Sequence, residues 1–178
     1  MTTPIPTMDA IEAGQFRETL TAAVRQHEVR YTDAHSLSMR WEKDDTEADK
    51  DTARFQMMLQ ALHFPAAHEL VIKENDSTPG WTARGKIRET LAAARRTSGR
   101  SIVIVHYAGH GELDSSRDLM LGKTSRFSAD RFLISLALDK VYDLQNTTNV
   151  DVLFILDCCY GYAACRASEV TDRVVELV

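Results

Sequence analysis

The 178-residue sequence lacks the features of several protein classes. It has no basic block, since 21 Lys and Arg are set against 26 Asp and Glu, and we therefore expect no nucleic-acid partner. No apolar run approaches the roughly 20 residues that span a bilayer, and the first residues form no basic and apolar leader. We expect neither a membrane protein nor one that is exported through a signal peptide.

Cysteine is scarce and confined to one stretch. The three cysteines are Cys158, Cys159 and Cys165, an odd and closely spaced set that makes no sensible disulfide framework. This favours a reducing compartment, and we expect a cytoplasmic protein. The glycine-rich fingerprints GxGxxG and GxxxxGK are also missing, which removes the usual sequence support for nucleotide binding.

What is present is an ordinary globular composition, with 44% hydrophobic and 26% charged residues. The first part of the chain has a capping-box pattern followed by apolar residues at helical spacing, which predicts a helix that ends near His27. We expect an N-terminal helical extension over residues 1–34 and one domain over residues 35–178.

Strands and helices are predicted to alternate through the domain. Strands are predicted at SLSMRW, ELVIK, SIVIVHY and VDVLFILD. Helices are predicted between them, with apolar faces formed by Phe55, Met58, Leu59 and Leu62, by Ile87, Leu91 and Ala94, and by Phe132, Leu133, Leu136 and Val141. Such alternation predicts an α/β fold with three layers, α/β/α, and a mostly parallel central sheet.

Reactive side chains follow the two most apolar strands. His106 and His110 lie in HYAGHG after SIVIV, and Cys158 and Cys159 lie in DCCYGY after VLFIL. Because the ends of parallel strands meet at one edge of a sheet, we expect a histidine and a cysteine to come together. Taken singly, each is more typical of a buried structural residue. A zinc site is disfavoured, since a strand and two flanking glycines do not align the two imidazoles.

These two motifs resemble those of the metacaspases. HYAGHG is similar to the family's H-Y-S-G-H-G, and DCCYGY is similar to its D-x-C-x-S-G. The resemblance runs from about Ser36 to the C-terminus. It implies a caspase-like cysteine peptidase of clan CD with His110 and Cys159 as the catalytic dyad. His106 and Cys158 would then be structural neighbours.

The resemblance also implies further parts of the site. The backbone amides of Gly111 and Cys159 would form the oxyanion hole, and the chemical step would need no metal or organic cofactor. Activation by Ca²⁺, which is common in metacaspases, stays open, because the acidic run EKDDTEADKD either holds a hard cation or is a solvated loop. Two departures concern the pocket: Ala108 replaces the usual serine, and Gly161-Tyr162 replaces Ser-Gly.

Acidic residues predict cleavage after Arg or Lys. Asp157 ends a buried strand, so its carboxylate is expected to face the cleft rather than bulk water, where a substrate guanidinium would pair with it. The resemblance places Asp51 and Ala108 in the same pocket, and Asp45 where caspases carry an arginine for acidic substrates. The alternative is that Asp157 caps turn amides and that the loop acids are solvated.

The chain ends at ASEVTDRVVELV, where the family begins its small-subunit half. We therefore expect a large-subunit portion whose partners are a peptide or protein substrate and a small-subunit chain or C-terminal half. Two other hypotheses stay open. One is a catalytically silent caspase-like signalling or interaction module, and the other is an ordinary flavodoxin-like ligand-binding domain.

Overall fold

The structure is a computed structural model that describes residues 31–122, 131–133, 149–161 and 175–177. The chain divides between Arg30 and Tyr31, and every described residue belongs to the second unit, residues 31–178. The helical extension predicted over residues 1–34 thus lies outside the described residues apart from its last four. Of those four, Asp33 and Ala34 already belong to the first strand.

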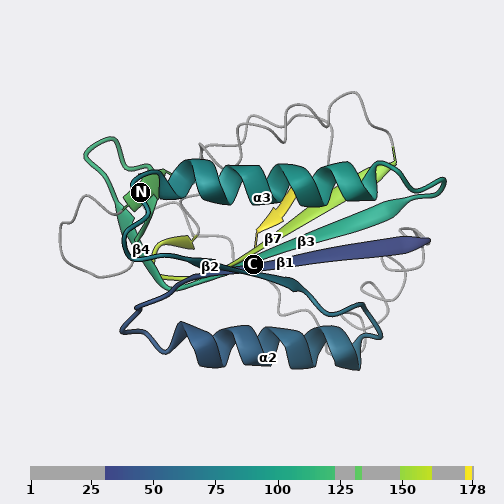
Figure 1. Cartoon of the computed structure of the whole chain (residues 1–178), viewed down its shortest axis with the longest axis horizontal. Helices are drawn as coiled ribbons and strands as arrows, with labels where there is room; N and C mark the ends of the chain where they lie inside the picture. The colour runs from purple at the N-terminus through teal and green to yellow at the C-terminus, as the bar shows by residue number, and fades with distance from the viewer. Residues whose placement is uncertain (1–30, 123–130, 134–148, 162–174, 178) are drawn as a thin grey trace, which may run out of the picture. The chain divides into compact units, whose positions relative to one another are not determined.

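A five-stranded parallel sheet forms the centre of this unit (Figure 1). Its strands lie in the order β2 (His68–Ile72), β1 (Asp33–Trp41), β3 (Ser101–Ala108), β7 (Val150–Asp157) and β8 (Val175–Leu177), and every neighbouring pair is parallel. Helix α2 (Ala48–Ala61) covers one face and helix α3 (Pro79–Ala94) covers the other. This arrangement confirms the predicted three-layer α/β/α fold, and all four predicted strands are present.

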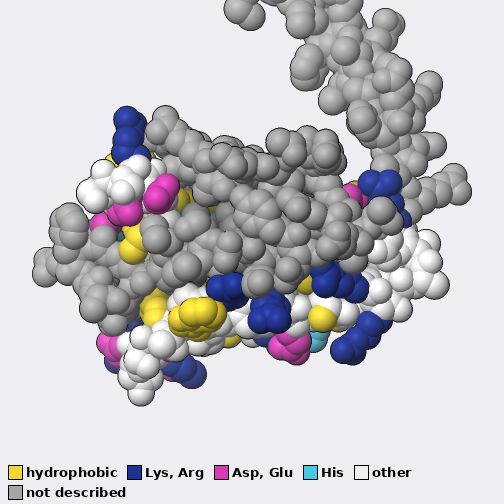
Figure 2. All heavy atoms as spheres, turned by 90° about the horizontal axis from the view of Figure 1, so that it is seen from above, with side chains coloured by type: hydrophobic (Ala, Val, Ile, Leu, Met, Phe, Trp, Pro, Cys, Tyr) yellow, Lys and Arg dark blue, Asp and Glu magenta, His cyan; other side chains and the backbone are white. Residues whose placement is uncertain are grey.

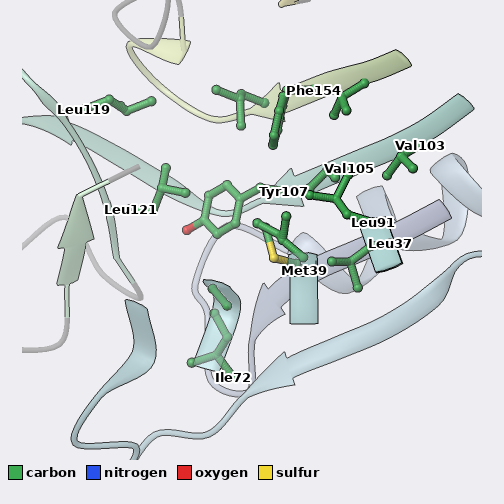
Figure 3. Packing of buried hydrophobic residues seen from close by; sticks show 14 of the residues in the cluster. Leu37, Met39, Ile72, Leu91, Val103, Val105, Tyr107, Leu119, Leu121 and Phe154 are labelled. Carbon is green, nitrogen blue, oxygen red and sulfur yellow. The ribbon is translucent and has the colours of Figure 1, made fainter. Parts of the chain in front are cut away.

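Strand β3 lies in the middle of the sheet, and both of its faces are buried. On one face Val105 and Tyr107 join an apolar cluster with Leu91 of α3 (Figure 3). On the other face Ile104 packs with Phe55 of α2. Alternate residues of a strand point to opposite faces, so a continuous apolar run is stable only between two covering layers.

Helix α2 turns a slightly different face to the sheet from the one predicted. Phe55 and Leu59 are buried as expected, but Met58 and Leu62 are exposed. The buried stripe continues instead through Thr52, one turn before Phe55. Because the buried stripe runs through Thr52, Phe55 and Leu59, Met58 lies about 100° around the helix axis from Leu59, on the solvent side of the stripe.

A second, antiparallel sheet was not predicted from the sequence. It contains β4 (His110–Leu113), β5 (Leu119–Gly122) and β6 (Arg131–Leu133). The prediction of a helix through Phe132 and Leu133 is therefore wrong, while Leu136 and Val141 lie outside the described residues. Apolar residues at helical spacing occur in short strands as well, and here the pairing with β5 decides the backbone conformation.

The surface of the described residues is mixed in character. None of the described helices combines the length and the apolar character that a membrane span requires. On the face shown in Figure 2, Lys and Arg side chains are interspersed with acidic and hydrophobic ones. The expectation that the chain binds no nucleic acid stays a prediction.

Candidate active site

The carboxyl ends of β3 and β7 lie side by side at one end of the parallel sheet. Ala108 of β3 is paired with Asp157 of β7, and the amide of Gly109 donates a hydrogen bond to the carbonyl oxygen of Asp157 over 3.3 Å. His110 and Cys159 follow these strand ends two residues later. The predicted convergence of the histidine and cysteine segments is therefore present in the fold.

Two glycines shape the histidine segment, and one of them, Gly111, lets it lie in contact with the cysteine segment. A Cβ atom at Gly111 would lie 2.2 Å from the carbonyl oxygen of Cys159 and 2.9 Å from the Sγ atom of Cys158. Gly109 has a φ of +142°, and a Cβ atom there would lie 2.8 Å from the hydroxyl of Tyr107. Since a real Cβ atom does not approach a backbone atom to 2.2 Å, the close approach at Gly111 requires a residue without a side chain.

The two adjacent cysteines have different surroundings. Cys159 is exposed, and the next residue, Tyr160, has a φ of +60°, so the chain turns sharply there. Cys158 is half-buried against the main apolar cluster, and this burial is the main reason that its pKa is raised to about 12. At neutral pH Cys158 is therefore a thiol, and Cys159 is the accessible sulfur. Cys165 lies outside the described residues.

His106 has the contacts of a core residue. Its Nδ1 atom lies 2.9 Å from the hydroxyl oxygen of Ser38, and its ring stacks on Phe55 with the ring centroids 4.4 Å apart. Burial lowers the pKa of His106 to about 4, and the carboxylate of Asp51 offsets only part of that effect. The imidazole is neutral at physiological pH, which fits the structural part that the family resemblance implied.

His110 is held at both its backbone and its side chain. The hydroxyl of Tyr107 donates a hydrogen bond of 3.1 Å to the carbonyl oxygen of His110. The imidazole is 18% exposed, and its Nε2 atom is hydrogen-bonded to Oδ1 of Asp45. Asp45 was predicted as a substrate-binding residue, and its contact with the histidine was not foreseen. No sequence signal joins two residues 65 positions apart in this way.

Asp157 lies within the electrostatic reach of Asp51, in the first turn of α2. The pKa of Asp157 is raised, first by partial burial and then by the carboxylate of Asp51, while the guanidinium of Arg54 acts in the opposite direction. Arg54 binds Asp51 through a hydrogen bond of 2.6 Å. Asp157 as a whole is nonetheless exposed, which corrects the expectation that its carboxylate is withdrawn from bulk water. Ala108, its buried neighbour across the strands, lies beside it as expected.

The acidic run between Glu42 and Asp51 does not gather its carboxylates at one point. Oδ1 of Asp44 accepts a hydrogen bond of 2.7 Å from the amide of Thr46, whereas Glu47 is paired with a lysine. Within the described ranges no three His, Cys, Asp or Glu side chains lie close enough together to hold a metal ion. Among the described residues the acidic run therefore forms no preformed calcium site. Activation by Ca²⁺ stays a hypothesis.

Comparison with known proteins adds one finding to this geometry. A protein-family model described as the caspase domain matches residues 39–176. The match covers most of the chain and includes both His110 and Cys159. No curated protein matches the chain.

Proposed function

The chain belongs to the caspase-domain family of cysteine peptidases, and from this premise we propose that it is an endopeptidase of the metacaspase type that acts through Cys159 and His110. The observation that carries the proposal is the packing of Gly111 directly on the backbone of Cys159. This packing brings the histidine motif and the cysteine motif to one place at the carboxyl end of the sheet. The resemblance of the two motifs to those of metacaspases does not by itself predict the contact between Gly111 and Cys159.

The proposed reaction has two steps. The thiolate of Cys159 attacks the peptide carbonyl carbon, and protonated His110 gives its proton to the leaving amine as the C–N bond breaks. A water molecule then attacks the resulting thioester while His110 accepts a proton from it, and the thiolate is released with the new carboxylate. The exposure of Cys159 supports this part, because the sulfur is open to a substrate.

The backbone amides of Gly111 and Cys159 are proposed to bind the oxyanion of the tetrahedral intermediate. Their suitability rests on the close approach at Gly111, where any side chain would collide with the cysteine segment. Gly111 is buried, and its lack of a side chain allows the backbone of the cysteine segment to lie directly against its own backbone.

We further propose that the primary pocket accepts Arg or Lys. Partial burial is the main reason that the pKa of Asp157 is raised, and the nearby carboxylate of Asp51 raises it further by charge repulsion. A cation between them would relieve this repulsion, and the chain's own Arg54 already binds Asp51. A substrate guanidinium has the same chemistry and can bind such carboxylates in a bidentate manner. An acidic substrate residue would add a third negative charge.

Matched peptides that end in Arg, Lys or Asp before the scissile bond test this specificity. We expect cleavage after Arg and Lys only. Asp157→Asn should lower kcat/KM for both basic peptides about tenfold or more, because a charge-assisted hydrogen bond contributes roughly 1.5–3 kcal/mol. Glu89→Gln is the control, because it also removes one negative charge. Glu89 lies on α3, which covers the face of the sheet opposite to α2 and Asp51.

Two results would count against the proposal. Preference for the Asp peptide, or full cleavage of the Arg peptide by Asp157→Asn, would show that the pocket lies elsewhere. If the wild-type chain cleaves no peptide and a peptidyl electrophile does not label Cys159, the catalytically silent module is the better description.

A further inference from the structure

We propose that Asp45 is a positioning residue of this peptidase, which orients His110 and completes a triad of Cys159, His110 and Asp45. The inference rests on the proposed role of His110. The observation behind it is the hydrogen bond between Nε2 of His110 and Oδ1 of Asp45. Neither the family match nor the sequence pattern assigns this role to Asp45.

The contact selects which nitrogen of His110 takes part in proton transfer. A carboxylate only accepts hydrogen bonds, so Nε2 must carry a proton, and its N–H group donates the hydrogen bond to Asp45. Nδ1 is then the nitrogen that exchanges a proton with Cys159 and the substrate. An acceptor on the far nitrogen thus sets both the tautomer and the plane of the ring.

The loop that carries Asp45 is fixed on both sides. The amide of Glu42 donates a hydrogen bond of 2.8 Å to the carbonyl oxygen of Ile72, at the end of β2. On the other side of Asp45, the amide of Thr46 donates to Oδ1 of Asp44 over 2.7 Å. Side-chain to backbone hydrogen bonds of this kind hold a turn in one conformation. Asp45 is therefore presented by a loop of defined shape.

The same loop packs against the backbone next to His110. A Cβ atom at Gly109 would lie 2.9 Å from Oδ2 of Asp44. Gly109 directly precedes His110 and Asp44 directly precedes Asp45, so the two segments are also in contact next to the hydrogen-bonded pair. The position of Asp45 relative to His110 is thus set by packing as well as by the hydrogen bond. A positioning residue needs such support, because a small displacement of a catalytic group costs much of its rate enhancement.

Orientation, more than charge, is expected to be the contribution of Asp45. Its side chain is 68% exposed, and water screens the interaction of exposed charges strongly. The carboxylate of Asp45 is already hydrogen-bonded to the imidazole of His110. The two carboxylates of the proposed pocket instead interact with Arg54, which pairs with Asp51 and acts to lower the pKa of Asp157. Asp45 therefore fits a role at the histidine better than the substrate-binding role predicted from its place in the sequence.

Steady-state kinetics of Asp45 variants test the proposal. Asp45→Asn should lower kcat about ten- to a hundredfold while KM for an Arg peptide changes little, because the amide can present its donor group to Nε2 and stabilise the wrong tautomer. Asp45→Glu keeps the carboxylate and should recover part of the loss. Asp49→Asn is the matched control: it removes the same charge from the first turn of α2 and should leave kcat unchanged.

A double variant separates this inference from the proposed function. If Asp45 acts through His110, then Asp45→Asn combined with His110→Ala should be no slower than His110→Ala alone. A rise in KM for basic peptides with unchanged kcat would overturn the inference and return Asp45 to the substrate pocket. So would unchanged kcat and KM in Asp45→Asn. If His110→Ala itself keeps full activity, the proposed function fails first.

Discussion

Cys158 and Cys159 have identical side chains, yet their surroundings assign them different chemistry. The raised pKa of Cys158, about 12, keeps its sulfur protonated at neutral pH, and the side chain packs against the apolar core. Cys159 projects into solvent beside a sharp turn. Since the thiolate rather than the thiol is the nucleophile, the raised pKa disfavours Cys158, and the exposed Cys159 is the cysteine that a substrate can reach.

Alkylation should distinguish the two cysteines. In a Cys165→Ser background at pH 7.5, we expect iodoacetamide to modify Cys159 and to leave Cys158 intact, as peptide mass spectrometry would measure. Cys159→Ala should abolish both the label and peptide turnover, whereas Cys158→Ala should keep most of both. Rapid modification of Cys158 in the folded chain would contradict the assignment.

At the scale of elements, β3 joins the core to the site within one strand. Its residues 102–105 are apolar on both faces, and near its end His106 contacts Phe55 of α2 and the hydroxyl of Ser38. The histidine motif therefore has one buried imidazole that supports the packing of α2 and one, His110, beyond the strand end. Burial of His106 anchors the end of β3, and His110 follows that end two residues later.

The buried imidazole makes stability depend on pH. Unfolded histidine has a pKa near 6.5, whereas burial lowers that of His106 to about 4. Above pH 6.5 both states hold a neutral ring. As the pH falls from about 6.5 towards 4, the unfolded chain gains a proton that the folded chain does not, so the free energy of unfolding decreases.

Thermal unfolding between pH 7.5 and 4.5 should show this loss. We expect the fall in Tm across that range to be smaller in His106→Leu, whose side chain does not titrate, even though that variant is less stable at pH 7.5. His63→Gln, an exposed histidine after α2, is the control and should keep the slope of the wild type. Equal slopes in all three proteins would show that His106 does not govern the acid response.

At the scale of the whole molecule, the end of the parallel sheet is the feature that bears on partners. Among the described strands, β8 pairs only with β7 and is the last on its side of the sheet. A strand at the end of a sheet presents backbone N–H and C=O groups that another chain can pair with. The small-subunit half that the family resemblance implies stays a prediction, and this side of the sheet is where we expect it to add.

Association should therefore accompany activity. We expect turnover per chain to increase with protein concentration, because peptide binding as an added strand depends on elements beyond the described sheet. A dilution series with light scattering and a peptide substrate measures both quantities, and Cys159→Ala should associate like the wild type without turnover. A chain that stays monomeric throughout, with constant turnover, would contradict this expectation.

Much of the fold could be predicted because its strongest signals are local. SIVIVHY and VDVLFILD are continuous apolar runs of β-branched character, which identify central parallel strands without reference to any contact. The rule that such strands end at a common edge then predicts that the segments of His110 and Cys159 converge. The antiparallel strands β4 to β6 were missed because they are short and their pairing, not their composition, makes them strands.

The layered fold, its central strands and the two motifs at their ends follow from the local pattern of residues, since periodicity and strand composition act within a few residues along the chain. The exposure of Asp157, the face that α2 buries and the contact of Asp45 with His110 instead depend on packing in the folded chain. These depend on how loops and helices pack against each other across long sequence separations. A change of one ångström or of a fraction of a helical turn alters such contacts and leaves the sequence pattern the same.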